Sequence, residues 1–265
     1  MKRDVGANLE LEIIEPSELV FSVAVAAGVP REREQLTVTL DGERVDADEL
    51  EDEHGTRLHR VVVGRGALAL DYSATVVGQA APATASAAEL VRYRRPSRYA
   101  ESDALFPTAA AEFVGISDPA ELLTSVSSWV GTRLAYVSGS SLPTDGAMRT
   151  FLARQGVCRD FAHLTVALLR ARNVPARLVS VYAPGLHPMD FHAVAEAHID
   201  GAWYVVDATT LAPRSTLVRI ATGRDAADTA FLTTISGAVA LGTMTVTAVA
   251  DVLPDDDLTQ PVQLR

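Results

Sequence analysis

The sequence predicts an α+β fold, in which an N-terminal all-β sandwich precedes a core of helices packed on an antiparallel sheet. Three observations support this prediction. Short β-rich runs alternate with turn signals up to about residue 77, a stretch of small residues follows, and from residue 119 apolar residues recur with a helical period before β-rich runs return. Helices followed by strands favour an α+β arrangement over alternating βαβ units.

The first 80 residues are predicted to form the β-sandwich domain. Its β-rich runs occupy residues 9–13, 19–25, 36–40, 58–63 and 67–77. Asp41-Gly42 and His54-Gly55 suit hairpin turns between strands. Residues 78–87 are small and lack apolar periodicity. We therefore expect residues 81–95 to be a linker and residues 96–265 to form a second domain, the core.

Three helices are predicted in the core. The first begins after Asp118, whose side chain can cap it, with Pro119 in the first turn. The second covers residues 146–154, and the third covers residues 159–172 and ends before Pro175. The antiparallel sheet is expected from β-rich runs at residues 176–182, 193–199, 202–207 and 243–252.

Composition narrows the class of protein and its partners. The chain has 265 residues, and its hydrophobic content of 48% is ample for a packed core. The formal net charge of −11 argues against nucleic-acid binding, because phosphate binding requires basic patches. No apolar run approaches the roughly 18 residues of a membrane span. We therefore expect neither a nucleic acid nor a membrane as a partner, and the oligomeric state stays open.

The cellular compartment is predicted from the N-terminus and from cysteine usage. Residues 1–4 lack the apolar segment of a secretory signal. The chain contains one cysteine, which cannot form an intrachain disulfide and suits a reducing environment. These two features together favour a cytoplasmic protein.

That cysteine, Cys158, is the first candidate for chemistry. It follows the turn Gly156-Val157 and begins a helical pattern. A thiol at a helix N-terminus faces unpaired backbone N–H groups and the positive end of the peptide dipoles, which favour the thiolate. Asp160, in the same first turn, is expected to complement the dipole rather than to react. Cys158 is therefore predicted to be a nucleophile.

A cysteine nucleophile needs a base, and the base needs a group that orients it. If Asp200-Gly201 forms a two-residue turn, Ile199 pairs with Ala202 in the hairpin. In this register His192 becomes a diagonal neighbour of Asp207 on one face, at a Cβ separation of about 7 Å, within reach of a hydrogen bond. A slip of one residue would put the two on opposite faces. The hairpin thus predicts a base and its orienting carboxylate.

The other histidines fit a chemical role less well. His198 lies about 20 Å along the strand from His192. His163 is five residues after Cys158, outside the i+3 and i+4 positions that meet on a helix, and His187 sits in a Pro-Gly loop that could line a cleft. A metal site would require His187, Asp190, His192 and Glu196, but strand alternation separates them and no CxxC or HExxH spacing occurs. We therefore expect no metal and no cofactor.

Several segments together resemble the transglutaminase-like superfamily, in particular bacterial members with an N-terminal β-domain. The matching segments are residues 96–103, residues 156–164 around Cys158, residues 190–193 around His192, Trp203, and Asp207-Ala208-Thr209. The resemblance covers about residues 95–237. It implies a papain-like fold, in which the cysteine helix packs against an antiparallel sheet.

The resemblance also implies functional roles. Cys158 would be the nucleophile, His192 the general base and acid, and Asp207 the carboxylate that orients His192. Val194 replaces a tryptophan that is frequent in the family, and Ala208 replaces a proline. Neither change removes a reacting atom, but the loss of the tryptophan reshapes the acceptor side of the cleft.

The predicted activity is acyl transfer from an amide, in a peptide or isopeptide bond, through a thioester on Cys158. Hydrolysis is favoured, because nothing marks a site for an amine acceptor; the chain would then be a cysteine peptidase or amidase. The alternatives are a protein-glutamine transglutaminase with an amine acceptor and, in another class, a non-catalytic module whose core binds a peptide or a partner protein. The N-terminal β-domain fits the latter, since its edge strands could present or receive a peptide. Further candidates for the oxyanion site or the cleft are Gln155, His187, Glu196 and Trp203.

Overall fold

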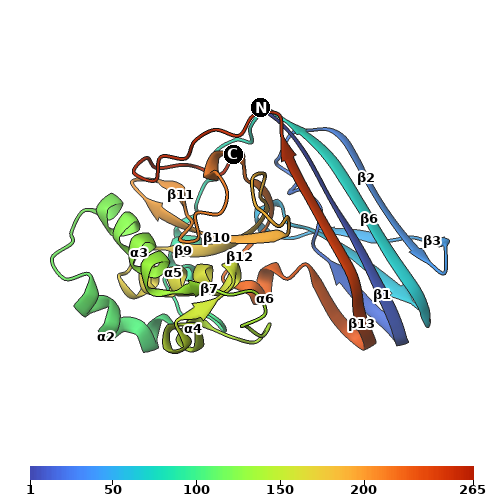
Figure 1. Cartoon of the computed structure of the whole chain (residues 1–265), viewed down its shortest axis with the longest axis horizontal. Helices are drawn as coiled ribbons and strands as arrows, with labels where there is room; N and C mark the ends of the chain where they lie inside the picture. The colour runs from blue at the N-terminus through green and yellow to red at the C-terminus, as the bar shows by residue number, and fades with distance from the viewer.

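A computed structural model describes all residues, 1–265. The chain forms one large curved sheet on one side and a core of helices and a smaller sheet on the other (Figure 1). The predicted α+β class, with β structure first and helices packed on an antiparallel sheet afterwards, is confirmed. No helix combines the length and the apolar character needed to cross a membrane.

The large sheet has seven antiparallel strands. They are β1 (Lys2–Phe21), β2 (Arg31–Leu40), β3 (Glu43–Val45), β4 (Asp48–Glu51), β5 (Arg57–Val63), β6 (Gly66–Val77) and β13 (Leu232–Ala250). The order is β3-β2-β6-β1-β5-β4, and β13 pairs with the other side of β1. A short 3₁₀ helix, Glu53–Gly55, lies between β4 and β5.

The N-terminal strands form a single sheet rather than the two facing sheets of a sandwich, because β1 is long and bends. Its first half, residues 2–13, pairs with β6, and its second half, residues 17–21, pairs with β5. The runs expected at 9–13 and 19–25 therefore fall largely on one strand. The bend comes at Pro16, where Gly237 of β13 comes so close that a Cβ on it would lie 2.4 Å from the Pro16 carbonyl oxygen.

The last strand corrects the predicted grouping of the chain. Residues 243–252 were expected in the sheet of the core, but β13 pairs with β1 from Arg3–Ala250 to Phe21–Leu232. The chain thus returns to its first strand after completing the core, so the core is inserted into the large sheet. Within the expected linker, residues 81–95, the chain forms α1 (Ala87–Arg92), which begins with a Ser86–Glu89 capping box.

The core is built around the helix α5 (Cys158–Ala171). The other helices are α2 (Ser102–Glu112), α3 (Pro119–Arg133), α4 (Ala147–Ala153) and α6 (Ala226–Thr229), with a 3₁₀ helix at Arg214–Thr216. The four-stranded antiparallel sheet has the order β11 (Ala202–Val206), β10 (Phe191–Ile199), β9 (Ala176–Tyr182), β12 (Val218–Gly223). From Asp160 to Ala171 every residue of α5 is buried, which is typical of a helix enclosed by other elements. The sheet and the remaining helices therefore hold α5, and with it Cys158, in one position.

Candidate active site

Cys158 is the first residue of α5 and lines a cleft with a volume of about 440 Å³. Asp160 shapes the turn before it, because its Oδ2 accepts a hydrogen bond from the backbone N–H of Val157 at 2.8 Å. Its Oδ1 accepts one from the Ser141 hydroxyl at 2.8 Å. Gly156 is required here, since a Cβ on it would lie 2.6 Å from the Cβ of Asp160. The turn thus presents a partly exposed thiol at the start of a buried helix.

The strand β10 brings His192 to this thiol. Ile199 pairs with Ala202 and Ala195 with Val206, which is the register expected from the Asp200-Gly201 turn. His192 Nε2 donates a hydrogen bond to Asp207 Oδ2 at 3.0 Å, and both side chains are buried. His192 lines the same cleft as Cys158. Its Nδ1 is buried and has no hydrogen-bond partner elsewhere in the protein, so it is free to exchange a proton in the cleft.

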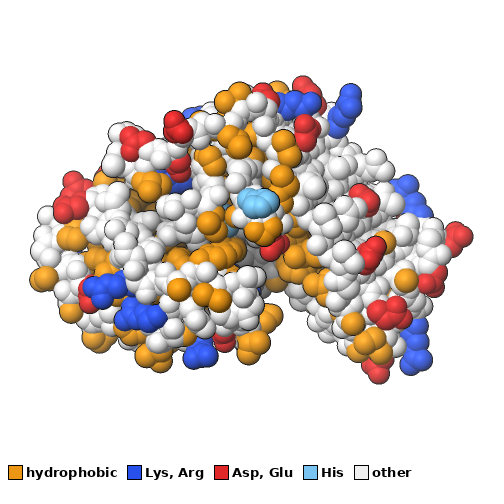
Figure 2. Space-filling view, in the orientation of Figure 1, with side chains coloured by type: hydrophobic (Ala, Val, Ile, Leu, Met, Phe, Trp, Pro, Cys, Tyr) orange, Lys and Arg blue, Asp and Glu red, His pale blue; other side chains and the backbone are white.

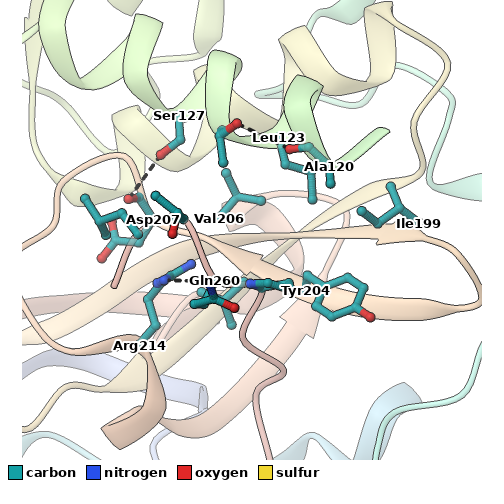
Figure 3. A pocket seen from close by; sticks show the side chains of 14 residues that line it. Ala120, Leu123, Ser127, Ile199, Tyr204, Val206, Asp207, Arg214 and Gln260 are labelled. Atoms are coloured by element: carbon teal, nitrogen blue, oxygen red, sulfur yellow. Dashed lines mark hydrogen bonds between the residues drawn. The ribbon is translucent and has the colours of Figure 1, made fainter. Parts of the chain in front are cut away.

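Asp207 is itself held from two sides. Its Oδ1 accepts hydrogen bonds from the backbone N–H of Thr209 at 2.8 Å and from the Thr209 hydroxyl at 2.7 Å. Its backbone carbonyl accepts one from the Ser127 hydroxyl of α3 at 3.3 Å, as Figure 3 shows. The carboxylate therefore reaches His192 in a single orientation.

A small cavity of about 60 Å³ lies behind Asp207 and is lined partly by the C-terminal tail. Arg214 holds this tail, since its Nη2 donates to the Gln260 carbonyl oxygen at 3.1 Å (Figure 3) and its Nε donates to Asp256 at 2.9 Å. The backbone N–H of Val205 donates to the Val262 carbonyl oxygen at 2.8 Å. The tail thus covers the outer edge of β11 next to the Asp207 carboxylate.

The electrostatics favour an ion pair between His192 and Asp207. Burial by itself would lower the pKa of His192, but the charge and hydrogen bond of Asp207, followed by the influence of Cys158, raise it to about 10. Burial would raise the pKa of Asp207, but His192 and the hydrogen bonds from Thr209 lower it below its usual value. The site can therefore keep an imidazolium beside the cysteine at neutral pH.

Tyr136 is a cleft residue that the sequence analysis did not identify. It lies on the two-residue strand β7 (Ala135–Tyr136), which pairs in parallel with β8 (Gln155–Gly156), and β8 ends two residues before Cys158. Burial, and then the charge of the neighbouring Cys158, raise the pKa of Tyr136 to about 12, while the backbone N–H of Cys158 acts in the opposite direction. No local pattern signals this role, because β7 is short and its partner is about twenty residues away in sequence.

The cleft also has a wall that the sequence analysis did not identify. Ala226, Ala230, Phe231, Leu232 and Met244, which follow the core strands, line it together with Cys158 and His192. The β-rich pattern of residues 243–252 does not specify a partner strand, so it could not place β13 at the cleft.

Two of the further candidates are buried away from the cleft. Glu196 accepts hydrogen bonds from Arg177 Nε at 2.8 Å and from Arg219 Nη2 at 2.7 Å. Trp203 carries the Arg177 guanidinium 3.9 Å from its ring centroid and packs edge-on against Tyr93 at 5.7 Å. Glu196 is thus not a cleft residue. Its side chain is not solvated, because β10 is covered on both faces, and the two arginines balance its negative charge.

The remaining candidates also lie outside the cleft lining. Gln155 and His187 are exposed and do not line the cleft. Gln155 pairs with Ala135 through its backbone, and its side chain is exposed. His198 packs against Trp203 with their ring centroids 5.1 Å apart. The four residues that a metal site would require, His187, Asp190, His192 and Glu196, do not lie together. No group of three or more His, Cys, Asp or Glu side chains is placed to hold an ion.

His163 fastens the cysteine helix to the loop that lines the cleft. Its Nε2 accepts a hydrogen bond from the backbone N–H of Ala226 at 3.1 Å, and its ring stacks on Tyr99 at 5.5 Å. Burial lowers the pKa of His163 to about 3, although Asp225 opposes this shift. A neutral imidazole is required, because the ring nitrogen is the acceptor.

These two histidines predict a maximum in folding stability near pH 6.5. His163 binds a proton more weakly in the folded than in the unfolded chain, so its contribution is present above pH 6.5 and is lost as the pH falls toward 3. His192 binds its proton more tightly in the fold, so its contribution is present below pH 6.5 and is lost as the pH rises toward 10. Each pKa unit corresponds to about 1.4 kcal/mol. We therefore expect the free energy of unfolding to fall by a few kcal/mol on the acid limb and on the alkaline limb of its pH curve.

Urea unfolding between pH 4 and 9 measures both limbs. His163→Gln, which keeps an acceptor for Ala226, should flatten the acid limb, and Asp207→Asn should flatten the alkaline limb. His54 and His59, whose pKa values burial also lowers, add to the acid limb in the same direction. If the free energy of unfolding depended on pH in the same way in the wild type and both variants, the assignment of the acid limb to His163 and of the alkaline limb to His192 would be wrong.

A family model described as the transglutaminase-like superfamily matches residues 107–208. Among solved structures, a candidate cysteine protease from Cytophaga hutchinsonii is 31% identical, with a TM-score of 0.89, and the match covers 99% of this chain and 96% of that chain. An uncharacterised protein of Mycobacterium tuberculosis is 40% identical over 81 residues, which are 31% of this chain and 26% of that protein.

An uncharacterised protein of Mycobacterium leprae is 27% identical over 124 residues, and the match covers 43% of this chain and 43% of that protein. The chain therefore spans between about a quarter and less than half of the length of the curated relatives that it matches.

Proposed function

The chain belongs to the transglutaminase-like superfamily, and from this premise we propose that it is a cysteine peptidase or amidase that cleaves amide bonds through a thioester on Cys158. One observation carries the proposal. His192, hydrogen-bonded to Asp207 at 3.0 Å, lines the same cleft as the thiol of Cys158. The likeness to a candidate cysteine protease over nearly the whole chain supports hydrolysis in particular.

The first half-reaction transfers the acyl group to the enzyme. The Cys158 thiolate attacks the amide carbonyl carbon and forms the C–S bond of a tetrahedral intermediate. His192, held as the imidazolium by Asp207, gives its proton to the amide nitrogen, so the C–N bond breaks and the amine leaves. A thioester on Cys158 and a neutral His192 remain.

The second half-reaction releases the acid. Neutral His192 takes a proton from water, the hydroxide attacks the thioester carbonyl, and the thiolate leaves. The carboxylic acid departs, and His192 keeps the proton that regenerates the thiolate–imidazolium pair. Asp207 remains ionised throughout and stabilises the imidazolium, since its own pKa is held low.

The negative oxygen of each tetrahedral intermediate needs donors that are already in position. The backbone N–H of Cys158 and the hydroxyl of Tyr136 lie together at the start of α5. Tyr136 stays protonated at neutral pH, because its pKa is raised to about 12. We assign these two groups to the oxyanion site in place of Gln155, whose side chain is exposed.

Tyr136→Phe is expected to lower kcat by about 10²-fold, because one of two oxyanion donors is lost. The ring should keep its packing on Phe161, 5.8 Å away between centroids, so the melting temperature should hardly change. Tyr204→Phe, in the cavity behind Asp207 and not in the cleft, is the matched control. An unchanged kcat in Tyr136→Phe would show that the Tyr136 hydroxyl does not stabilise the oxyanion.

A screen of a peptide and amide library with mass detection, with and without a primary amine, tests the function. We expect products that gain water at one bond, and no such products with Cys158→Ser. Products that carry the amine instead would identify a transglutaminase. Retained peptide binding by both proteins with no turnover of any substrate would contradict catalysis and identify a binding module.

A further inference from the structure

The three free edges of the large sheet differ in how they are protected. β3 and β4, at the two ends of the sheet, are three and four residues long. Each carries charged side chains, among them Glu43, Arg44, Asp48 and Glu49. Short, charged strands prevent another chain from pairing with an edge. Residues 31–37 of β2, which β3 leaves unpaired, also begin with four charged residues, 31–34. Both ends of the sheet are thus protected against strand addition.

β13 is the third free edge, and it is neither short nor charged. It has 19 residues and pairs only with β1. From Leu232 to Ala250 it contains no charged residue and no proline, and three of its apolar side chains, Ile235, Leu241 and Val249, are exposed by 45–57%. A long, uncharged, exposed edge promotes aggregation, so its place beside the cleft suggests a use in binding.

This edge runs into the candidate active site. Leu232 and Met244, from the two arms of the bent strand, line the cleft that contains Cys158. Figure 1 shows β13 as the strand of the large sheet that faces the core, and Figure 2 shows a hollow between the two parts with hydrophobic side chains along it. An added strand on β13 would therefore lead to the thiol.

The wall beside the edge suits an apolar side chain. Phe231 stacks on Phe191 with ring centroids 5.4 Å apart, which joins the large sheet to the core. Phe231, Leu232 and Met244 pack on the core of the large sheet but are only partly buried. Their remaining apolar surface can take up a side chain next to the reacting bond.

We propose that the free edge of β13 docks the substrate, an extended polypeptide segment that adds as a further strand and inserts a bulky apolar side chain against Phe231 and Met244. The backbone of β13 supplies affinity that is independent of sequence, and the apolar wall selects the residue near the scissile amide. This inference rests on the proposed function for its cleavage step but not for its binding step. It names unfolded or extended polypeptides, rather than small amides, as the substrate class.

The binding test uses Cys158→Ser protein and a fluorescent twelve-residue peptide of alternating valine and threonine with lysine at both ends. A second peptide carries N-methyl groups on alternate backbone nitrogens, so it keeps the side chains but cannot form a ladder. We expect the first peptide to bind at least tenfold more tightly than the second. Equal affinity of the two peptides would overturn strand addition.

Edge variants locate the binding. Thr234→Lys and Thr243→Lys put a charge on exposed positions of β13 and should weaken peptide binding at least tenfold. Val62→Lys, an exposed position of β5, is the matched control and should not change it. Weaker peptide binding in all three variants, or in none, would contradict docking at β13. Gel filtration that shows a dimer formed through this edge, with no peptide binding, would contradict it as well.

Turnover separates this inference from the proposed function. Wild type and Thr234→Lys should cleave a small acyl anilide equally, whereas cleavage of a long unstructured peptide should fall at least tenfold in the variant. Equal loss on both substrates, or on neither, would remove the edge from substrate recognition while leaving the proposed function intact. Peptide binding without any cleavage would instead refute the function and leave the docking surface standing.

Discussion

Asp207→Asn is expected to lower kcat by about 10³- to 10⁴-fold, the size of effect that follows when the orienting carboxylate of a triad is lost. The asparagine still fits between His192 and Thr209, but it removes the charge that holds the imidazolium in a buried position. Burial then dominates and lowers the pKa of His192, because it is the opposing influence in the wild type. His192 would no longer carry a proton for the leaving amine at neutral pH.

The pH profile distinguishes this mechanism from a general loss of structure. In the wild type, the decline of kcat at alkaline pH should follow deprotonation of His192, whose pKa is about 10. In Asp207→Asn the decline should move to lower pH. Asp190→Asn, which changes another carboxyl of the cleft, should cost less than about tenfold, because Asp190 makes no hydrogen bond to His192. A profile that stays in place in Asp207→Asn would contradict the assigned role.

Glu196→Gln is expected to lower the free energy of unfolding by about 3–5 kcal/mol. Glu196 is 1% exposed and is the shared partner of Arg177 and Arg219. Without its charge, two largely buried guanidinium groups lose their counter-ion, and each has already given up its hydration. Urea unfolding at pH 7 measures the loss.

The control for Glu196 is an exposed ion pair in the same molecule. Glu18→Gln breaks the pair with Arg60, whose side chains are 30% and 38% exposed, and it should cost less than about 1 kcal/mol. Because Glu196 lies outside the cleft, kcat/KM of folded Glu196→Gln should match the wild type. A stability loss as small as that of Glu18→Gln would show that the arginines are compensated by other groups.

Local patterns predicted much of the core. The Asp118 cap and Pro119 start α3 as expected, with Asp118 accepting from the N–H of Ala120 at 2.7 Å. The Asp200-Gly201 turn sets the register that brings His192 to Asp207. Both predictions succeeded because the information lies within a few residues of the feature: a cap acts over one turn, and a hairpin turn decides which residues of its two arms face each other.

Other parts could not be predicted, because they depend on pairing across long sequence separations. β13 alternates like a strand of the core, but alternation does not specify a partner, and it pairs with β1 more than 200 residues earlier. The burial of Glu196 depends on arginines of β9 and β12, and the position of Tyr136 beside Cys158 depends on a parallel pair of two-residue strands.

Local signals are thus sufficient for the α+β class, the start of the cysteine helix and the hairpin that joins His192 to Asp207, because helix capping and turn geometry act over a few residues. Three other features become visible only in the folded molecule: β13 returns to the first sheet, Tyr136 lies beside the thiol, and the cleft has an apolar wall next to an open strand edge. These features arise from contacts between distant segments, which form because burying each surface is favourable only once the other segments are in place.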